Sequence, residues 1–365
     1  MIKLKKILIA TGGTGGHVLP AYSLANYLMK NNYKVKLTID SRGLKYIKDY
    51  KHLNLIKLPS SPLIKKNIIK FLHSIFVILF SILRSLIFLS LNRPSIIFGM
   101  GGYSSFPICI ASIILRIKFV TYENNLIIGK ANKYLLPFTK KLFVSYKDLE
   151  GVPKKYDYKI IEIGNIIREE IINSKIRKNK NSKLKDIKVL VLGGSQAAKV
   201  FADKLPQIFE KLKNSEVPIK VYQQCQNGQN YKLSEFYKKA KIDYEIFNFT
   251  NNIKDYYDKA NLVITRSGAS ALGELVNINI PFISIPLPTS ADNHQFKNAA
   301  YYKKKGLGYL ITETEINGQL YDLIKSFIKD ETLIKNILTN QSQYSDKNIF
   351  KDINIHIKNI INEKN

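Results

Sequence analysis

The sequence predicts an α/β protein built from two doubly wound, Rossmann-like domains. Three observations support this fold class. A short apolar run, a glycine cluster and a helical pattern open the chain, and the same arrangement returns halfway along it, at residues 188–194. The third observation is the length of 365 residues, which exceeds what one hydrophobic core usually organises.

The first predicted domain begins with a buried strand at residues 7–10, and the glycines of residues 12–16 lead from it into a helix. Further strands are predicted at residues 34–39 and 95–98. The second of these is again followed by glycines, within residues 99–102. Glycine turns after parallel strands are typical of folds that bind phosphates.

The second predicted domain begins with the strand 188–192 and the turn Gly193-Gly194, and strands 262–265 and 282–285 continue its sheet. The lysine- and asparagine-rich residues 173–185 are interpreted as a hinge or surface loop. We expect an N-terminal domain at 1–165, a C-terminal domain at 166–340, and a final helix at 341–365 packed outside both.

The composition indicates a globular protein, with 45% hydrophobic and 23% charged residues. Its two cysteines, Cys109 and Cys225, lack paired spacing and indicate neither a disulfide framework nor a zinc site. The net charge of +29 has two interpretations: compositional bias of the genome, or an anionic partner. Nucleic-acid-binding motifs are absent, so no nucleic-acid partner is expected, and an anionic membrane surface remains.

Residues 71–91 are almost continuously apolar and long enough to span a bilayer. Arg84 lies inside this segment, and the strand 95–98 follows at once, which argues against a span. Two alternatives remain: a helix buried in the first domain, or a helix lying on a bilayer surface. In the second case Lys65, Lys66 and Lys70 would meet anionic head groups.

The glycine turns predict a diphosphate ligand, because backbone amides and a helix N-terminus attract phosphate. The chain has no P-loop motif, and residues 12–16 depart from Gly-x-Gly-x-x-Gly. Asp40 ends the second strand where a dinucleotide fold places its ribose-binding acid, which keeps an NAD enzyme as an alternative. No Asp-x-Asp motif occurs, so we expect neither a metal nor another cofactor, and amides and cations would hold the diphosphate.

Two further segments carry polar residues suited to a sugar nucleotide. Residues 265–275 begin at a strand end and continue as a helix, and Glu274 would lie one to two turns inside it. This carboxylate is placed to accept two ribose hydroxyls, although an ordinary solvated glutamate is the alternative. The polar loop 286–295 is suited to binding sugar hydroxyls.

Taken in order, these motifs resemble those of the MurG family, peripheral glycosyltransferases with the GT-B fold that add N-acetylglucosamine to lipid I in peptidoglycan synthesis. The resemblance covers nearly the whole chain and implies two Rossmann-like domains that face each other across a cleft. The motifs are Gly12-Gly13-Thr14-Gly15-Gly16-His17, Gly99-Met100-Gly101-Gly102-Tyr103, Glu123-Asn124-Asn125, Gly164-Asn165 with Arg168, Gly193-Gly194-Ser195-Gln196, residues 266–274 and Asp292-Asn293-His294-Gln295.

The resemblance implies UDP-N-acetylglucosamine as donor and undecaprenyl-diphosphate-linked N-acetylmuramyl pentapeptide (lipid I) as acceptor. It also implies that the protein acts at the cytoplasmic face of the inner membrane, where residues 63–80, with Lys65, Lys66 and Lys70, contact lipid. For the donor, the resemblance assigns Ser195 and Arg168 to the phosphates, the backbone near Thr250 to the uracil, Glu274 to the ribose, and Asn125, Ala269 and Gln295 to the sugar. It assigns Thr14, Gly15 and Gly16 to the acceptor diphosphate and the donor. The remaining substrate-binding residues, without a narrower role, are Tyr103, Ser270, Ala271, Leu272 and Gly273.

The implied chemistry is inverting, because the C4 hydroxyl of the acceptor sugar attacks the anomeric carbon as UDP leaves from the opposite face. His17 is the predicted general base, and ordering of its loop by hydrogen bonding is the competing role. Glu123 is the second candidate catalytic residue. The chain departs from the family pattern at Tyr122, where histidine is usual, at Ile166 in place of proline, and at Ala197 in place of glycine.

Other functions stay open at this point. A second UDP-sugar-dependent GT-B transferase, or a sugar-nucleotide epimerase acting on a soluble substrate, would use the same glycine turns. A noncatalytic basic scaffold on membranes or RNA would explain the charge but not the ordered glycine turns.

Overall fold

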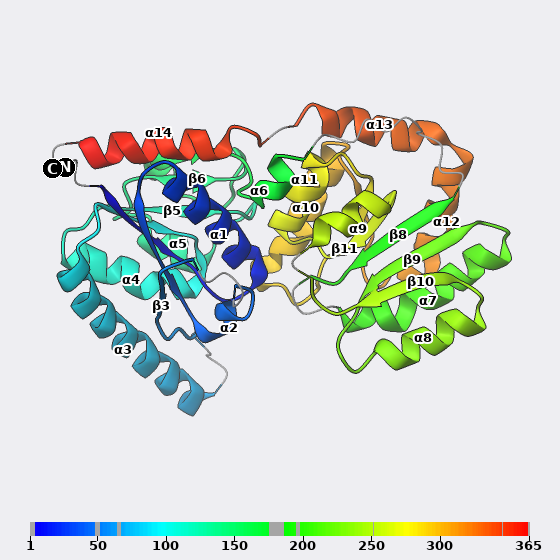
Figure 1. Ribbon diagram of the computed structural model, residues 1–365, viewed down its shortest axis with the longest axis horizontal. Helices are drawn as coiled ribbons and strands as arrows, with labels where there is room; N and C mark the ends of the chain where they lie inside the picture. The colour runs from blue at the N-terminus through cyan, green and yellow to red at the C-terminus, as the bar shows by residue number, and fades with distance from the viewer. Residues whose placement is uncertain are drawn as a thin grey trace. The chain divides into compact units, whose positions relative to one another are not determined.

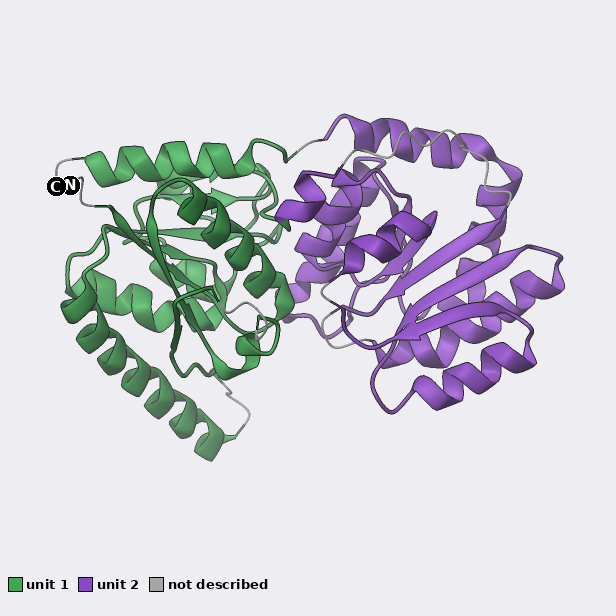
Figure 2. Cartoon of the chain, in the orientation of Figure 1, with its two compact units in different colours: residues 1–168, 346–365 green, residues 169–345 purple. Residues whose placement is uncertain are grey.

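The structure is a computed structural model that describes residues 4–47, 52–63, 67–174, 186–194, 198–250, 252–344 and 346–363. The chain divides into two compact units (Figure 2). Unit 1 comprises Met1–Arg168 with Asp346–Asn365, and unit 2 comprises Glu169–Ser345. Each unit has a parallel sheet and its own hydrophobic core, which confirms the predicted fold class of two doubly wound α/β domains.

Unit 1 contains a seven-stranded parallel sheet in the order β3-β2-β1-β4-β5-β6-β7 (Figure 1). The chain therefore builds outward in one direction to β3 and then restarts beside β1, so the switch point of the topology lies between β1 and β4. The strands are β1 (Lys6–Ala10), β2 (Lys34–Ile39), β3 (Leu55–Lys57), β4 (Ile96–Gly99), β5 (Phe119–Glu123), β6 (Leu142–Val144) and β7 (Ile160–Glu162).

The helices of unit 1 cover this sheet. Side chains of α3 and α4 pack with β1, β4 and β5 in one apolar cluster. The helices are α1 (Gly15–Lys30), α2 (Ser41–Leu44), α3 (Ile68–Asn92), α4 (Gly102–Ile114), α5 (Lys130–Leu135), a 3-10 segment (Lys154–Lys159) and α14 (Ile349–Asn362).

Unit 2 repeats the design with six parallel strands in the order β10-β9-β8-β11-β12-β13, so its switch point lies between β8 and β11. The strands are β8 (Ile187–Leu192), β9 (Ile219–Gln224), β10 (Asp243–Phe247), β11 (Leu262–Thr265), β12 (Phe282–Ser284) and β13 (Tyr309–Leu310). The helices are α6 (Glu169–Ile172), α7 (Lys199–Asn214), α8 (Asn230–Lys239), α9 (Ile253–Lys259), α10 (Ala269–Asn277), a 3-10 turn (Ala291–Asn293), α11 (His294–Lys304), α12 (Ile316–Lys329) and α13 (Glu331–Ser342).

The C-terminal region differs from the expectation of one helix outside both domains. Gln341 is buried in unit 2, where its side chain donates to the carbonyls of Ile280 (3.0 Å) and Leu307 (2.7 Å). Helix α14 instead belongs to unit 1, and the hydroxyl of Tyr33 donates to Asn354 there (2.9 Å). The apolar face of α14 explains this return, because its isoleucines at every third or fourth position are buried.

Helix α3 contains the long apolar segment, and it is not the buried helix that one alternative predicted. Its buried residues are Ser74, Ser81, Ser85 and Leu89, so three of the four inward side chains are serines. Among the described residues α3 is long and apolar enough to cross a membrane, by length and composition alone. The outward face, here called the α3 apolar stripe, consists of Ile68, Ile69, Leu72, Phe76, Leu79, Phe80, Leu83, Ile87 and Leu91.

Candidate active site

The glycine turns of each unit lie at its switch point, which is where ligands bind in open α/β sheets. In unit 1 the ends of β1 and β4 are paired, and Met100 N donates to the carbonyl of Ala10 (2.9 Å). In unit 2 the ends of β8 and β11 are paired, and Arg266 N donates to the carbonyl of Leu192 (3.1 Å). The two predicted phosphate loops of each unit therefore start side by side.

In unit 1, Asp40 organises the first glycine loop. Its carboxylate is 2% exposed and accepts from Gly13 N (2.8 Å), Gly43 N (2.8 Å) and Ser60 Oγ (2.7 Å). Burial alone would raise the pKa of Asp40, but the amide, hydroxyl and guanidinium donors around it hold the pKa below its ordinary value. These donors occupy the carboxylate, so it does not serve as the ribose-binding acid of an NAD enzyme, and that alternative is not supported.

Gly12 is required because the Asp40 side chain packs directly against it. Its φ is +157°, and a Cβ atom there would lie 2.8 Å from Asp40 Oδ1 and 2.7 Å from Ser104 Cβ. Gly101, in the second loop, has a φ of +81°, and its added Cβ would lie 2.9 Å from the carbonyl oxygen of Tyr122. Both glycines are thus dictated by the protein's own packing.

His17 lies in the first turn of α1 and connects the two glycine loops. Its Nδ1 lies 3.0 Å from the carbonyl oxygen of Met100. A carbonyl only accepts, so Nδ1 carries the proton and Nε2 has the lone pair of the neutral ring. Nε2 faces the second loop, because a Cβ on Gly102 would lie 3.7 Å from it. Thr14, the N-cap of α1, is exposed and makes no side-chain capping bond, while Gly15 is buried and Gly16 is half-buried.

Glu123, predicted as catalytic, is surrounded by donors from its own loop. Its Oε1 accepts from Asn125 N (3.1 Å) and Nδ2 (3.0 Å), and its Oε2 accepts from Gly129 N (2.8 Å) and Asn132 Nδ2 (2.9 Å). The carboxylate is 4% exposed. In this arrangement Glu123 orients Asn125, which is half-buried and was assigned to the donor sugar.

Tyr122, where the family has histidine, is a buried structural residue. Its hydroxyl lies 2.7 Å from Ser145 Oγ and accepts from Ile166 N (2.9 Å), and burial is the main reason that its pKa is raised. Ile166 is itself buried. The two departures from the family pattern therefore contact each other and hold the segment that leads to Arg168, which is half-buried at the end of unit 1.

In unit 2 one glycine of each loop meets open space. Among the residues that the structure describes, an added Cβ at Gly194 or at Gly268 would find no atom within 4 Å. Gly268 is the N-cap of α10 and supplies no side chain to its first amides. The hydroxyl of Ser267 beside it is buried and has no hydrogen-bond partner among the described residues. Ser195 and Ala197 lie outside the described residues, so the expected phosphate contact of Ser195 stays a prediction.

Glu274 is the sixth residue of α10, which confirms its predicted place one to two turns into the helix. It is not a solvated glutamate, because it is 5% exposed and accepts from the hydroxyl of Tyr257 (3.1 Å). The preceding residues of α10 are also predicted substrate contacts. Of these, Ala269, Leu272 and Gly273 are buried, and Ser270 and Ala271 are half-buried.

Two predicted donor-binding residues lie on other loops of unit 2. Thr250 is half-buried in the turn before α9, and its Oγ1 accepts from Asn252 N (3.0 Å). Gln295 is the second residue of α11, and its Oε1 accepts from Leu287 N (3.0 Å), which fixes the side chain beside the 286–295 loop. These contacts position the two side chains; which ligand atoms they meet remains a prediction.

The described residues contain no group of three or more histidine, cysteine, aspartate or glutamate side chains that could hold a metal ion. Helices α1, α4 and α10 begin at the glycine loops without side-chain caps, so their N-termini supply partial positive charge there. Arg266 is engaged elsewhere, since its Nη1 donates to the carbonyls of Ile285 (3.2 Å) and Pro286 (3.1 Å) and its Nη2 pairs with Glu313.

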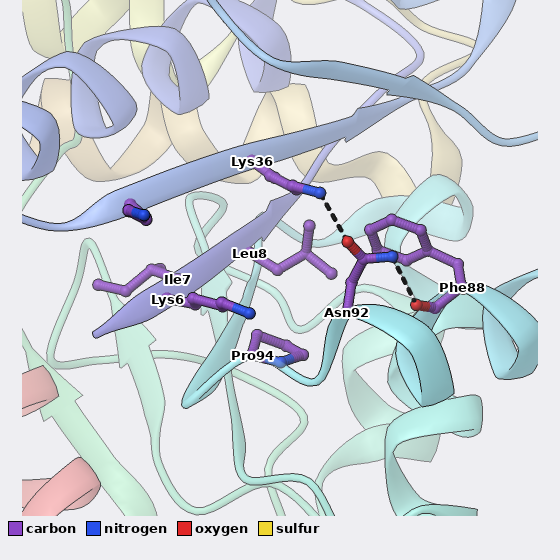
Figure 3. Close-up of a pocket in the computed structure, with 8 residues that line it drawn as sticks. Lys6, Ile7, Leu8, Lys36, Phe88, Asn92 and Pro94 are labelled. Atoms are coloured by element: carbon purple, nitrogen blue, oxygen red, sulfur yellow. Dashed lines mark hydrogen bonds between the residues drawn. The ribbon is translucent and has the colours of Figure 1, made fainter. Parts of the chain in front are cut away.

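A pocket of about 90 Å³ lies away from the glycine loops, at the amino ends of β1 and β2 (Figure 3). Lys6, Lys34 and Lys36 line it together with Phe88 and Asn92 of α3. Lys36 Nζ donates to Asn92 Oδ1 (2.7 Å), as Figure 3 shows. No motif of the sequence indicates this lysine cluster. The signal that could have found it is that β1 and β2 each open with a lysine, because pairing of the two parallel strands places Lys6 beside Lys34.

Two doubly wound units with glycine loops at both switch points, and a buried glutamate in the helix after one of them, are the features of a GT-B nucleotide-sugar enzyme. The chain belongs to glycosyltransferase family 28. The model of the family's N-terminal domain matches residues 7–144, and that of its C-terminal domain matches residues 188–356.

Full-length relatives agree with this assignment. A protein of Pelagibacter ubique is 36% identical over 98% of this chain and 99% of its own length. A protein of Rickettsia canadensis is 35% identical over 92% of this chain and 94% of its own length. Both are named UDP-N-acetylglucosamine--N-acetylmuramyl-(pentapeptide) pyrophosphoryl-undecaprenol N-acetylglucosamine transferase. The predicted resemblance to the MurG family is confirmed.

Solved structures share the fold. Acinetobacter baumannii MurG superposes with a TM-score of 0.75 at 21% identity, covering 97% of this chain and 99% of the other. The MnaA-UDP structure of S. aureus gives 0.70 at 16% identity, covering 99% of both chains. At these identities the likeness establishes the fold and does not distinguish a transferase from other enzymes built on it.

Proposed function

We propose that this protein transfers N-acetylglucosamine from UDP-N-acetylglucosamine to the C4 hydroxyl of lipid I with inversion. The relatives named for this reaction, at about 35% identity over nearly their whole length, support the substrates. The structural observation that carries the proposal is the open space at Gly194 and Gly268, beside the uncapped N-terminus of α10 and ahead of Glu274.

Unit 2 binds the donor in this proposal. The diphosphate lies on the loops at the switch point, where main-chain amides and the helix N-terminus offer positive charge and no Cβ fills the space. Glu274 then accepts the two ribose hydroxyls, since a ribose lies about one to two turns from a phosphate at the helix start. Ser195 and, from the end of unit 1, Arg168 add contacts to the phosphates. The backbone near Thr250 contacts the uracil, and Gln295 contacts the donor sugar.

Unit 1 binds the acceptor and removes its proton. The C4 oxygen forms a bond to the anomeric carbon while the bond from that carbon to the UDP oxygen breaks, and its electron pair leaves with UDP. The hydroxyl proton passes to Nε2 of His17, which the bond from Nδ1 to Met100 keeps in the basic tautomer. We assign Glu123 to positioning of Asn125 in place of proton transfer, because four donors already hold its carboxylate.

The charge that develops on the leaving β-phosphate is stabilised by fixed dipoles. Amides at the N-terminus of α10 and at the Gly193-Gly194 turn point toward a ligand that carries negative charge. Such preorganised donors cost little reorganisation during the reaction, and they serve the function that an Asp-x-Asp motif with its metal serves elsewhere.

The α3 apolar stripe brings unit 1 to the bilayer at the cytoplasmic face of the inner membrane. Helix α3 buries serines and exposes nine large apolar side chains, which is the opposite of what a helix facing water does. Such an apolar face suits contact with a lipid surface. The stripe extends past the expected residues 63–80 as far as Leu91. Lys70 is exposed at one end of the helix, and Lys6 and Lys34 lie at the other, while Lys65 and Lys66 lie outside the described residues.

Transfer of radiolabelled sugar from UDP-N-acetylglucosamine to lipid I, followed by product analysis, tests the proposed reaction. We expect lipid II and UDP in equal amounts. Release of a 2-epimer or of free sugar at the same rate with and without lipid I would instead establish the alternative of an epimerase or hydrolase acting on a soluble substrate.

Flotation with vesicles of anionic phospholipid at low salt tests the membrane surface. Wild-type protein is expected to float, and Phe76→Asp on the stripe is expected to lower the floating fraction severalfold, because a carboxylate replaces an aromatic ring in the lipid. Ile355→Asp is the matched control, since Ile355 is an exposed isoleucine on α14. Equal loss in both variants, or no binding by the wild type, defeats this part of the proposal.

A further inference from the structure

Arg42 lies between the two glycine loops of unit 1, and no motif of the sequence singled it out. Its guanidinium carbon is 4.7 Å from the ring centre of Tyr103, in the second loop. Its Nη2 is 3.4 Å from where a Cβ on Gly13, in the first loop, would lie. One cation therefore lies beside both loops that begin at the ends of β1 and β4.

The Arg42 side chain is held by its neighbours, and about half of it stays exposed to solvent. Nε and Nη2 of Arg42 donate to Oδ2 of Asp40 at 3.2 Å and 2.9 Å. Arg42 also forms a hydrogen bond with the side chain of Tyr103. The Arg42 side chain is nevertheless 47% exposed, whereas that of Asp40 is 3% exposed. A buried carboxylate thus fixes a half-exposed guanidinium, and the ring of Tyr103 supports its face.

The surroundings suit an anion with several oxygen atoms. The helices α1 and α4 both start here, with 16 and 13 residues, and neither has a side-chain cap. Their N-termini contribute partial positive charge, and a guanidinium binds phosphate oxygens through two parallel N–H bonds. Asp40 adds one negative charge, but its oxygens point to the Gly13 and Gly43 amides and to Ser60.

We propose that Arg42 binds the diphosphate of the lipid-linked acceptor, and that Asp40 acts as a positioning residue that aims this guanidinium across the two glycine loops. The inference rests on the proposed function, which supplies an acceptor with a diphosphate. It adds a residue that discriminates acceptors by their charge, whereas the donor is bound through unit 2.

Steady-state kinetics of Arg42→Gln tests the proposal with lipid I and UDP-N-acetylglucosamine varied separately. We expect the KM for lipid I to rise about ten- to one-hundredfold, because charge-assisted hydrogen bonds are lost, with kcat changed less than threefold and the KM for the donor unchanged. Arg42→Lys is expected to restore the KM for lipid I only in part, since an ammonium does not bind bidentately. Arg116→Gln, at an exposed arginine after α4, is the matched control.

A second readout separates binding from support of the loop. Inorganic pyrophosphate should compete with lipid I in the wild type, and its inhibition constant should rise at least tenfold in Arg42→Gln while the temperature of unfolding stays within a few degrees. An unchanged KM for lipid I, or equal rises for donor and acceptor, overturns the role of Arg42. Absence of transfer by the wild type would instead overturn the proposed function, so the two failures are distinguishable.

Discussion

The two switch points use glycine for different reasons. In unit 1 the protein's own atoms fill the space beside Gly12 and Gly101, because Asp40, Ser104 and Tyr122 lie within 3 Å of an added Cβ. In unit 2 no atom of the described residues lies within 4 Å of a Cβ added at Gly194 or Gly268. The same fold thus has one preorganised loop pair, fixed by buried polar contacts, and one open pair that leaves room for a ligand.

This difference agrees with a division of labour. The reacting groups of unit 1 need a fixed geometry, since general-base catalysis depends on sub-ångström placement of His17. The donor side needs room for two phosphates next to main-chain amides.

The largest effect is expected for His17. His17→Ala should lower kcat by about 10²- to 10⁴-fold, the usual contribution of general-base catalysis. His17→Asn separates this role from loop ordering, because its amide can still donate to the carbonyl of Met100 but has no basic nitrogen. Both variants should be similarly inactive at saturating substrates in the transfer assay.

His52→Ala is the control, since His52 is an exposed histidine of the same unit that lies 3.0 Å from Asn26. Activity of His17→Asn within a few-fold of wild type would assign His17 to loop ordering alone. Activity of His17→Ala at that level would remove it from the mechanism altogether.

The glycines test the comparison directly. Gly12→Ala should destabilise the protein by about 3 kcal/mol, because its methyl group overlaps two neighbours that are themselves packed. Gly268→Ala should leave the free energy of unfolding within about 1 kcal/mol of wild type, since its φ of −69° suits alanine. Denaturant unfolding measures the first effect, and calorimetry with UDP should show weaker binding for Gly268→Ala only.

Much of this contrast lies beyond what the sequence can predict. The strands 34–39 and 262–265 were predicted to the residue, because apolar runs bounded by polar or glycine residues indicate buried strands. The place of Glu274 followed from counting along a helix. These features are local, and local patterns determine them.

The features that were missed depend on tertiary contacts. The place of Asp40 at the end of its strand kept an NAD enzyme open as an alternative, whereas its carboxylate accepts from Gly13 in the first glycine loop and from Ser60, 20 residues away. The sequence of α3 is apolar on nearly every side, so its pattern does not indicate that the face with the serines is the buried one. The return of α14 to unit 1 depends on its contacts with residues such as Tyr33, more than 300 positions earlier.

A smaller effect is expected at the ribose contact of unit 2. Glu274→Gln should weaken UDP binding by about 2 kcal/mol, or roughly thirtyfold, because hydrogen bonds to a charged acceptor are replaced by neutral ones. Tyr257→Phe is the control, since it removes a partner of Glu274 and leaves the carboxylate in place. Calorimetry with UDP and 2′-deoxy-UDP is decisive: the wild type should prefer UDP, and Glu274→Gln should not.

The smallest effect concerns Asp40 and pH. Its pKa in the folded protein lies below the unfolded value, so its hydrogen bonds stabilise the fold fully above about pH 4, and this contribution is lost as the pH falls through the folded pKa. Asp40→Asn should therefore be less stable than wild type at pH 7 by about 1–2 kcal/mol, and the gap should narrow below pH 4. Denaturant unfolding at pH 7, 5 and 3.5 measures it. A gap that stays constant, or widens in acid, would mean that the first glycine loop does not depend on the charge of Asp40, and the contrast between a preorganised and an open switch point would lose its electrostatic basis.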